Sequence, residues 1–202
     1  PDVVVALSDG GPGLVQVLRN TGGGNLNPVP LVSRSAGFNT SAVVVGDFDG
    51  NGTPDVAATS EGSSQVLVFL GEGNGGLDSG HITPVGTSSS PRALVAGFFD
   101  AGGILDLAVA CASEDRVRVL RGRNGGNGKG DGTFTTGPVL DVNPAPGVDE
   151  PTSIAAADLE LDGDLDLVTA NRSSATVSVF KNDGTGGFAL EVTPLGGGNP
   201  NG

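Results

Sequence analysis

Short apolar runs rich in valine and alanine alternate with glycine-rich polar turns along most of the chain. The runs at 42–45, 56–59 and 107–111 are almost continuously apolar, which is typical of buried strands. Runs such as 65–69 and 116–120 instead alternate between apolar and polar residues, which is the side-chain period of a β-strand. No stretch keeps a helical period, so the sequence predicts an all-β fold of many short strands.

The predicted strands repeat in four groups, and each group has an aspartate followed by an apolar run. These aspartates are Asp2, Asp55, Asp106 and Asp166. After each run come an alternating strand, a turn rich in Gly and Asn, and a weaker strand containing proline, which is tolerated at a sheet edge. In the later groups another apolar run precedes the aspartate. Four antiparallel strands in about 40–50 residues are typical of a β-propeller blade.

We expect the chain to form one propeller region, with units at about 1–40, 41–91, 92–151 and 152–195 and a Gly/Asn/Pro-rich tail at 196–202. The first unit begins at its second strand and is therefore expected to be incomplete. An apolar strand with an open edge invites pairing with another chain. We therefore expect the gap to be filled by further propeller blades or by another copy of the chain, in a filament or in a larger ring.

The loop at residues 47–55 has the pattern of a calcium site. Oxygen-bearing side chains fall at alternate positions, and glycines at 50 and 52 allow the tight curl that points them inward. Calcium takes six to eight oxygen ligands from carboxylates and carbonyls. By analogy with the EF-hand loop, position 53 would supply its carbonyl. The candidate ligands are Asp47, Asp49, Asn51, Thr53 and Asp55.

A second copy of this spacing lies at residues 158–166, between two strand-like runs. Its candidate ligands are Asp158, Glu160, Asp162, Asp164 and Asp166. A third copy has lost two of its oxygen ligands, because Phe98 and Gly102 stand where Asp47 and Asn51 stand. The sequence therefore predicts two calcium sites, and no tight site in the third unit. An ordinary acidic turn is the alternative explanation for each copy alone.

The pattern resembles the FG-GAP repeat of integrin α-subunits and the related VCBS-type repeats of bacteria. The resemblance rests on residues 46–52 with Asp55, and on glycine-rich hairpins such as 71–77. It implies a β-propeller, commonly of seven blades, with calcium in the loops that join the first two strands of a blade. Its calcium positions correspond to the two candidate ligand sets.

Composition narrows the function classes. The net charge is −13, which argues against nucleic-acid binding, and no apolar stretch is long enough to span a membrane. The one cysteine, Cys111, lies in an apolar run and is expected to be buried. The one histidine, His81, is expected at the surface, so no catalytic constellation is visible. Most of the eight phenylalanines are expected in the core, namely Phe48, Phe69, Phe98, Phe134, Phe180 and Phe188.

Three functions remain open. The first is a calcium-stabilised, secreted or cell-surface module for adhesion or for recognition of a protein or glycan, and the resemblance favours it. The second is a structural module that assembles with other copies. The third is part of a polysaccharide-acting enzyme, although the residues point to no catalytic chemistry. Extracellular calcium modules bind at about 10⁻⁴–10⁻³ M, which suits the first function.

Overall fold

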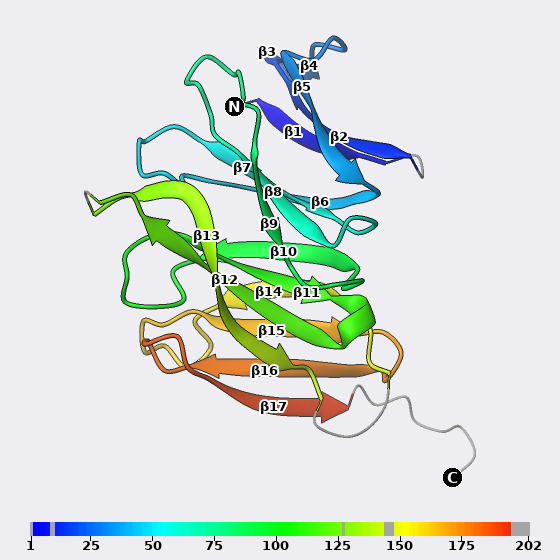
Figure 1. Ribbon diagram of the computed structural model, residues 1–202, viewed down its shortest axis with the longest axis vertical. Helices are drawn as coiled ribbons and strands as arrows, with labels where there is room; N and C mark the ends of the chain where they lie inside the picture. The colour runs from blue at the N-terminus through cyan, green and yellow to red at the C-terminus, as the bar shows by residue number, and fades with distance from the viewer. Residues whose placement is uncertain (1, 9–10, 127, 144–147, 195–202) are drawn as a thin grey trace.

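The computed structural model describes residues 2–8, 11–126, 128–143 and 148–194, and these form antiparallel sheets that follow one another along the chain (Figure 1). The all-β prediction is confirmed. A single turn of 3₁₀ helix, η1 (Ala112–Glu114), interrupts the strands. The described residues contain no helix long and apolar enough to cross a membrane.

The first sheet has three strands in the order β1-β2-β5, and a two-stranded ribbon extends from it. The strands of the sheet are β1 (Val3–Leu7), β2 (Pro12–Leu18) and β5 (Val32–Phe38), and those of the ribbon are β3 (Asn20–Gly22) and β4 (Asn25–Leu26). β1 forms an edge of this sheet.

Each of the other three sheets has four strands in sequence order. The second sheet consists of β6 (Thr40–Gly46), β7 (Asp55–Ser60), β8 (Gln65–Phe69) and β9 (His81–Pro84). The third consists of β10 (Pro91–Gly97), β11 (Asp106–Cys111), β12 (Arg116–Asn124) and β13 (Gly130–Asp141). The fourth consists of β14 (Pro151–Ala157), β15 (Asp166–Asn171), β16 (Thr176–Asn182) and β17 (Phe188–Pro194). The predicted tail at 196–202 lies outside the described residues.

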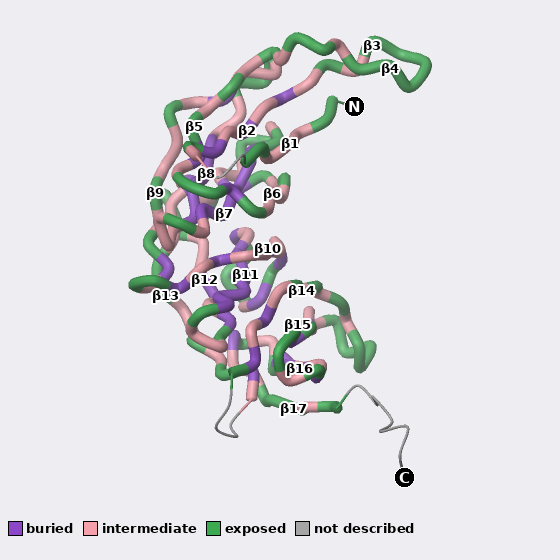
Figure 2. Tube along the Cα trace, turned by 90° about the vertical axis from the view of Figure 1, so that its right-hand side faces the viewer, coloured by how far each residue is buried: buried purple, intermediate pink, exposed green. Residues whose placement is uncertain are grey.

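The sheets stack face to face in an arc, with β1 and β17 toward opposite ends of the stack (Figures 1 and 2). The first strands of neighbouring sheets contact one another, since β6 meets β10 and β10 meets β14. The weaker outer strands β9, β13 and β17 are edges of their sheets. This is the arrangement of propeller blades around an axis.

Three hydrophobic clusters hold the stack together, and each lies between two neighbouring sheets. β7 shows why its sequence is continuously apolar: Val56 and Ala58 pack toward the first sheet, while Ala57 packs toward the third. Both faces of such a strand are buried, so no position is left for an exposed polar residue. Buried residues accordingly concentrate in the middle of the stack (Figure 2).

Of the six phenylalanines expected in the core, three are buried, Phe134 and Phe188 are partly buried against the core clusters, and one is exposed. Phe48, Phe69 and Phe180 are fully buried, but Phe98 is 53% exposed, so its assignment to the core is wrong. The neighbouring Phe99 is buried instead, because it is the second residue after β10, as Phe48 is after β6, and its amide likewise donates to the aspartate that begins the next strand. Phe99 therefore occupies the place that Phe48 has in the second sheet.

Candidate metal centre

Residues 47–55 connect β6 to β7 at one end of the second sheet. Gly50 and Gly52 both have positive φ, at 70° and 87°, which is the left-handed backbone that glycine adopts without steric cost. These two residues reverse the chain within a few positions. The predicted glycine-dependent curl is therefore present.

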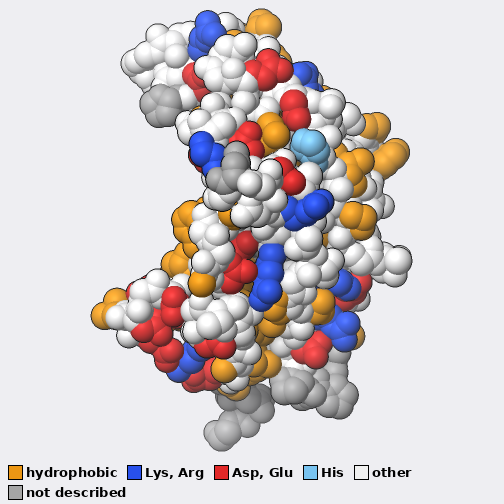
Figure 3. Space-filling model, turned by 60° about the vertical axis from the view of Figure 1, so that its left-hand side comes forward, with side chains coloured by type: hydrophobic (Ala, Val, Ile, Leu, Met, Phe, Trp, Pro, Cys, Tyr) orange, Lys and Arg blue, Asp and Glu red, His pale blue; other side chains and the backbone are white. Residues whose placement is uncertain are grey.

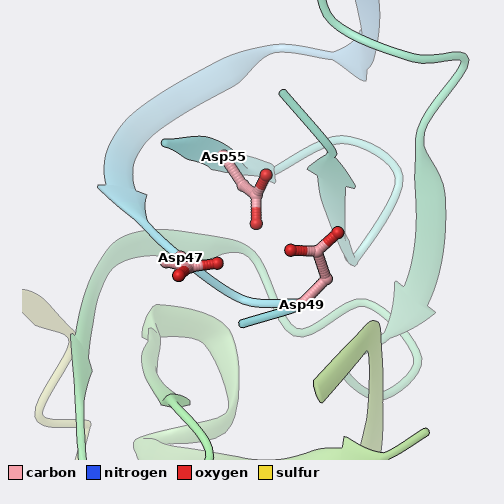
Figure 4. Close-up of side chains that lie close together, drawn as sticks. All are labelled: Asp47, Asp49 and Asp55. Atoms are coloured by element: carbon pink, nitrogen blue, oxygen red, sulfur yellow. The ribbon is translucent and has the colours of Figure 1, made fainter. Parts of the chain in front are cut away.

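Three carboxylates of this loop point toward a common centre (Figure 4). One oxygen from each of Asp47, Asp49 and Asp55 lies within 4.8 Å of the others. Asp47 is exposed, Asp49 is half-buried and Asp55 is fully buried, so the centre is open to solvent on one side. Carboxylate oxygens gathered in this way fit a hard divalent cation, whose charge would offset their mutual repulsion.

Backbone amides of the loop hold the exposed side chains in place. The amide of Asn51 donates to Asp47 Oδ1 and to Asp49 Oδ1, both at 3.0 Å, and the amide of Gly52 donates to Asp47 Oδ2 at 2.9 Å. The side-chain oxygen of Asn51 accepts from the amide of Thr53 at 2.6 Å. The predicted ligands at 47, 49, 51 and 53 are thus parts of one hydrogen-bonded turn.

Asp55 has a structural role besides. Its Oδ2 accepts from the amide of Phe48 at 2.7 Å, and its Oδ1 accepts from the amide of Gly71 at 2.8 Å. Burial raises the pKa of its carboxyl, and the nearby Asp49 adds to the rise, while the two amides oppose it. The side chain therefore ties the start of the loop to the hairpin that follows β8.

The same pair of hydrogen bonds recurs in the other two four-stranded sheets. Asp106 accepts from the amides of Phe99 and Gly122, at 3.1 and 2.8 Å. Asp166 accepts from the amides of Leu159 and Asn182, at 2.9 and 2.8 Å. We call Asp55, Asp106 and Asp166 the anchoring aspartates. All three are buried, and this explains why the third loop keeps Asp106 although it has lost two of its other oxygen ligands.

The loop at 158–166 repeats the turn but not the carboxylate cluster. The amides of Asp162 and Gly163 donate to Asp158 at 3.1 and 3.0 Å, as in the second sheet. Glu160, however, forms an ion pair with Lys181, with Nζ 2.9 Å from Oε1. Among the described residues, the one group of three acids close enough to share an ion is that at 47, 49 and 55. The second predicted ligand set therefore stays a prediction.

The loop at 98–106 also forms an ion pair with a basic residue of the third strand of its sheet. Arg121 Nε lies 3.4 Å from Asp100 Oδ2. Gly102 stands at the position that Asn51 has in the second loop, so the side chain is missing there. The backbone amide of Gly102 donates to Asp100 at 2.7 Å. The sequence prediction of no tight metal site here stays untested.

Two cavities lie beside the metal loop. One of about 280 Å³ is lined by Asp47, Phe98 and Lys129, between the second and third loops. Another of about 400 Å³ is mostly apolar and is lined by Val4, Val45 and the segment around Thr53, between the first two sheets. Figure 3 shows one face of the molecule, on which acidic side chains lie near a smaller number of basic ones.

The reactive side chains considered from sequence are not part of the group of carboxylates at the loop. Cys111 is buried in the core, and burial raises the pKa of its thiol to about 12, so it is no nucleophile at neutral pH. His81 lies on the edge strand β9, partly exposed, with Nε2 3.5 Å from Asp78 Oδ2.

Sequence reasoning missed two residues that contact the loops, Arg121 and Lys181. They follow the alternating strand of their units at equivalent positions, so alignment of the repeats could have found them.

The fold and the loop define a repeat protein of the β-propeller class. The sequence profile of the family described as FG-GAP-like repeat matches residues 1–58, 47–109 and 99–169. The chain belongs to this family, which confirms the resemblance. No curated protein matches the sequence.

Solved structures support the same fold. The periplasmic gluconolactonase of Pseudomonas aeruginosa aligns with a TM-score of 0.67 and 22% identity, over 96% of this chain and 54% of its own. A protein of Bacteroides uniformis provisionally named a 6-phosphogluconolactonase aligns with a TM-score of 0.62 and 16% identity, over 95% and 57%. A protein from Lactobacillus plantarum gives 0.64 and 18%, over 95% and 53%. The chain thus spans about half the length of the structures it matches, and the likeness shows the fold alone.

Proposed function

We propose that the chain is a calcium-stabilised propeller module that works outside cells in adhesion or in recognition of a protein or glycan. The proposal of a bound metal ion rests on the convergence of Asp47, Asp49 and Asp55 on one point. Three carboxylates, with carbonyl and amide oxygens of the same turn, match the ligand set that calcium prefers. Magnesium is less suited, because it demands six ligands in a near-ideal octahedron.

The proposed role of the ion is structural. The loop joins the first two strands of its sheet, and Phe48 within it is fully buried in the cluster between the second and third sheets. An ion bound there would fix the position of Phe48 through its two neighbouring aspartates. Binding to the native state alone adds about 2.7 kcal/mol of stability when free calcium exceeds Kd a hundredfold.

Adhesion or recognition, at the cell surface or in a secreted protein, is supported by the family to which the chain belongs. Assembly is a second candidate, supported by one observation. β1 is an edge strand, whereas the equivalent strands β7, β11 and β15 are paired on both sides. An open edge of this kind accepts a further strand, from other propeller blades or from another copy.

An enzymatic function is a third candidate, because two of the similar structures carry gluconolactonase names. Hydrolysis of a gluconolactone by the purified chain, measured against the spontaneous rate, tests it directly. Activity above background that survives EDTA would favour the enzyme over the recognition module.

The calcium proposal is tested by calorimetric titration and by thermal melting in EDTA and in calcium. We expect calcium to bind and to raise Tm. Asp49→Asn should abolish binding at residues 47–55, because Asp49 supplies a ligand without serving as an anchoring aspartate. Glu72→Gln, a control that removes a charge from the nearby hairpin, should leave binding unchanged. Equal melting in EDTA and calcium would refute the structural role.

Recognition and assembly are separated by two further measurements. A glycan array and a binding screen against extracellular matrix proteins test recognition. Light scattering in calcium tests assembly, which a stable monomer at high concentration would contradict.

A further inference from the structure

The residue that faces the loop from the third strand differs among the sheets. The registers pair Val56 with Phe69, Leu107 with Leu120, and Leu167 with Phe180. The next residue along the third strand therefore lies opposite the anchoring aspartate. These residues are Leu70, Arg121 and Lys181, in the second, third and fourth sheets.

The two basic residues at this position both form ion pairs with the same loop position. Lys181 pairs with Glu160 at 2.9 Å, and Arg121 pairs with Asp100 at 3.4 Å. Each of these acids is the third residue of its loop, equivalent to Asp49. In both loops a side-chain cation therefore already pairs with the carboxylate that a metal ion would need as a ligand.

The second sheet has no cation at this position, although Lys129, from the hairpin of the third sheet, lies beside the loop and lines a cavity with Asp47. Leu70 packs against the core cluster between the second and third sheets. Asp49 takes part in none of the ion pairs found among the described residues. This is also the loop in which three carboxylates converge.

We infer that the residue opposite the anchoring aspartate decides whether a loop takes a divalent cation. This inference rests on the proposed calcium function. Lys181 neutralises the charge of Glu160, so that Glu160 is not available as a calcium ligand. The loop at 158–166 otherwise has all the acids of the calcium pattern. Leu70 leaves Asp49 available. The chain then binds one calcium ion rather than the two that acid spacing predicts, and the fourth sheet holds a latent site closed by a lysine.

The ion pair is not expected to be strong in itself. Both partners are about 40% exposed, and such pairs contribute little to stability. Its effect on the metal is larger, because an incoming divalent ion must both displace the ammonium group and tolerate its positive charge at close range. Removal of the charge should therefore strengthen calcium binding at this loop by at least about tenfold.

The experiment uses the full chain with Asp49→Asn, so that the loop at 47–55 no longer binds calcium. Calcium binding is measured by calorimetry and by equilibrium dialysis, with circular dichroism to show that each variant folds. In this background we add Lys181→Leu, which copies Leu70, or Lys181→Gln, which removes the charge but keeps a polar side chain. Lys181→Arg is the matched control, since it keeps the cation.

We expect no site at millimolar calcium with Lys181 or with Lys181→Arg, and one site with Lys181→Leu and with Lys181→Gln. Addition of Asp158→Asn should remove the gained site. Conversely, Leu70→Lys in the otherwise unchanged chain should weaken binding at 47–55 by at least about tenfold.

The outcomes separate the two ideas. If the unchanged chain binds one ion that Asp49→Asn removes, but neither neutral replacement of Lys181 restores a site, the inference is overturned and the calcium function stands. If Asp49→Asn alone still binds an ion as tightly as the Lys181→Leu variant, the lysine closes nothing and the inference is again wrong. If the unchanged chain binds no calcium, the proposed function fails, and a site gained with Lys181→Leu would still support the role of the lysine.

Discussion

Removal of the anchoring carboxylate in the third sheet should destabilise the protein even without metal. Asp106→Ala takes both hydrogen-bond acceptors from the amides of Phe99 and Gly122. The Phe99 amide is buried, and a buried donor without a partner costs about 1–3 kcal/mol. The Gly122 amide is only part-buried and regains some hydrogen bonding from water, so we assign it about 1 kcal/mol. Relief from burying a carboxylate offsets part of this cost.

We therefore expect Asp106→Ala to lower the free energy of unfolding by about 2–3 kcal/mol, and Tm by roughly 4–12 °C for a chain of this length. The measurement is guanidinium denaturation in EDTA, which removes any metal contribution. Asp100→Ala is the matched control, because it removes a partly exposed ion pair from the same loop and should cost less than about 1 kcal/mol. If the two variants lose the same stability, the anchoring role is wrong.

Three further predictions concern pH, backbone strain and packing. Burial raises the folded pKa of Asp106 above its ordinary value of 3.8. The carboxyl therefore contributes stability that is fully present below pH 3.8 and is lost as pH rises through the folded pKa. The difference in unfolding free energy between the parent and Asp106→Ala, measured in EDTA, should therefore be larger near pH 4 than at pH 7. Leu161 has φ of 59°, is exposed, and stands where the second loop has Gly50, so Leu161→Gly should raise the free energy of unfolding by about 0.5–1 kcal/mol in the same assay, and a loss of stability would show that the strain is absent. A Cβ on Gly132 would lie 2.6 Å from Leu70, so Gly132→Ala should lower Tm in a thermal melt, by more than Gly103→Ala, where a Cβ meets nothing.

Much of the fold could be predicted because the same pattern of apolar and polar residues recurs in several repeats along the chain. The apolar run of β7 required burial on both faces, and its packing against two neighbouring sheets confirms this. A single repeat would have been ambiguous, since short apolar runs do not distinguish strands from buried helices. The error at Phe98 came from choosing the first of two adjacent phenylalanines, although the repeat alignment that places Phe98 at the position of Asp47 places Phe99 at the position of Phe48.

The candidate site was predictable in its loop residues but not in its surroundings. The spacing of acids pointed to two loops, and among the described residues three carboxylates converge at 47–55 but not at 158–166. It could not indicate that Glu160 pairs with Lys181, because that contact comes from a different strand and depends on register. The spacing of acids describes only the charges within one loop, whereas the electrostatic potential at a site depends on the charges of every element around it.

Two requirements on the loop explain why its acids are lost unevenly. An anchoring aspartate accepts backbone hydrogen bonds from the loop before it and from the end of the neighbouring third strand. Asp106 retains both bonds in a loop that has lost other candidate ligands. The residues at the first and fifth positions of the second loop, Asp47 and Asn51, are both exposed, and so are the hydrogen bonds that they accept from backbone amides, so their replacement leaves no buried amide unpaired. Phe98 and Gly102 stand at these positions in the third loop. The final aspartate of a repeat is therefore evidence for the fold, and the exposed acids before it are the better evidence for an ion.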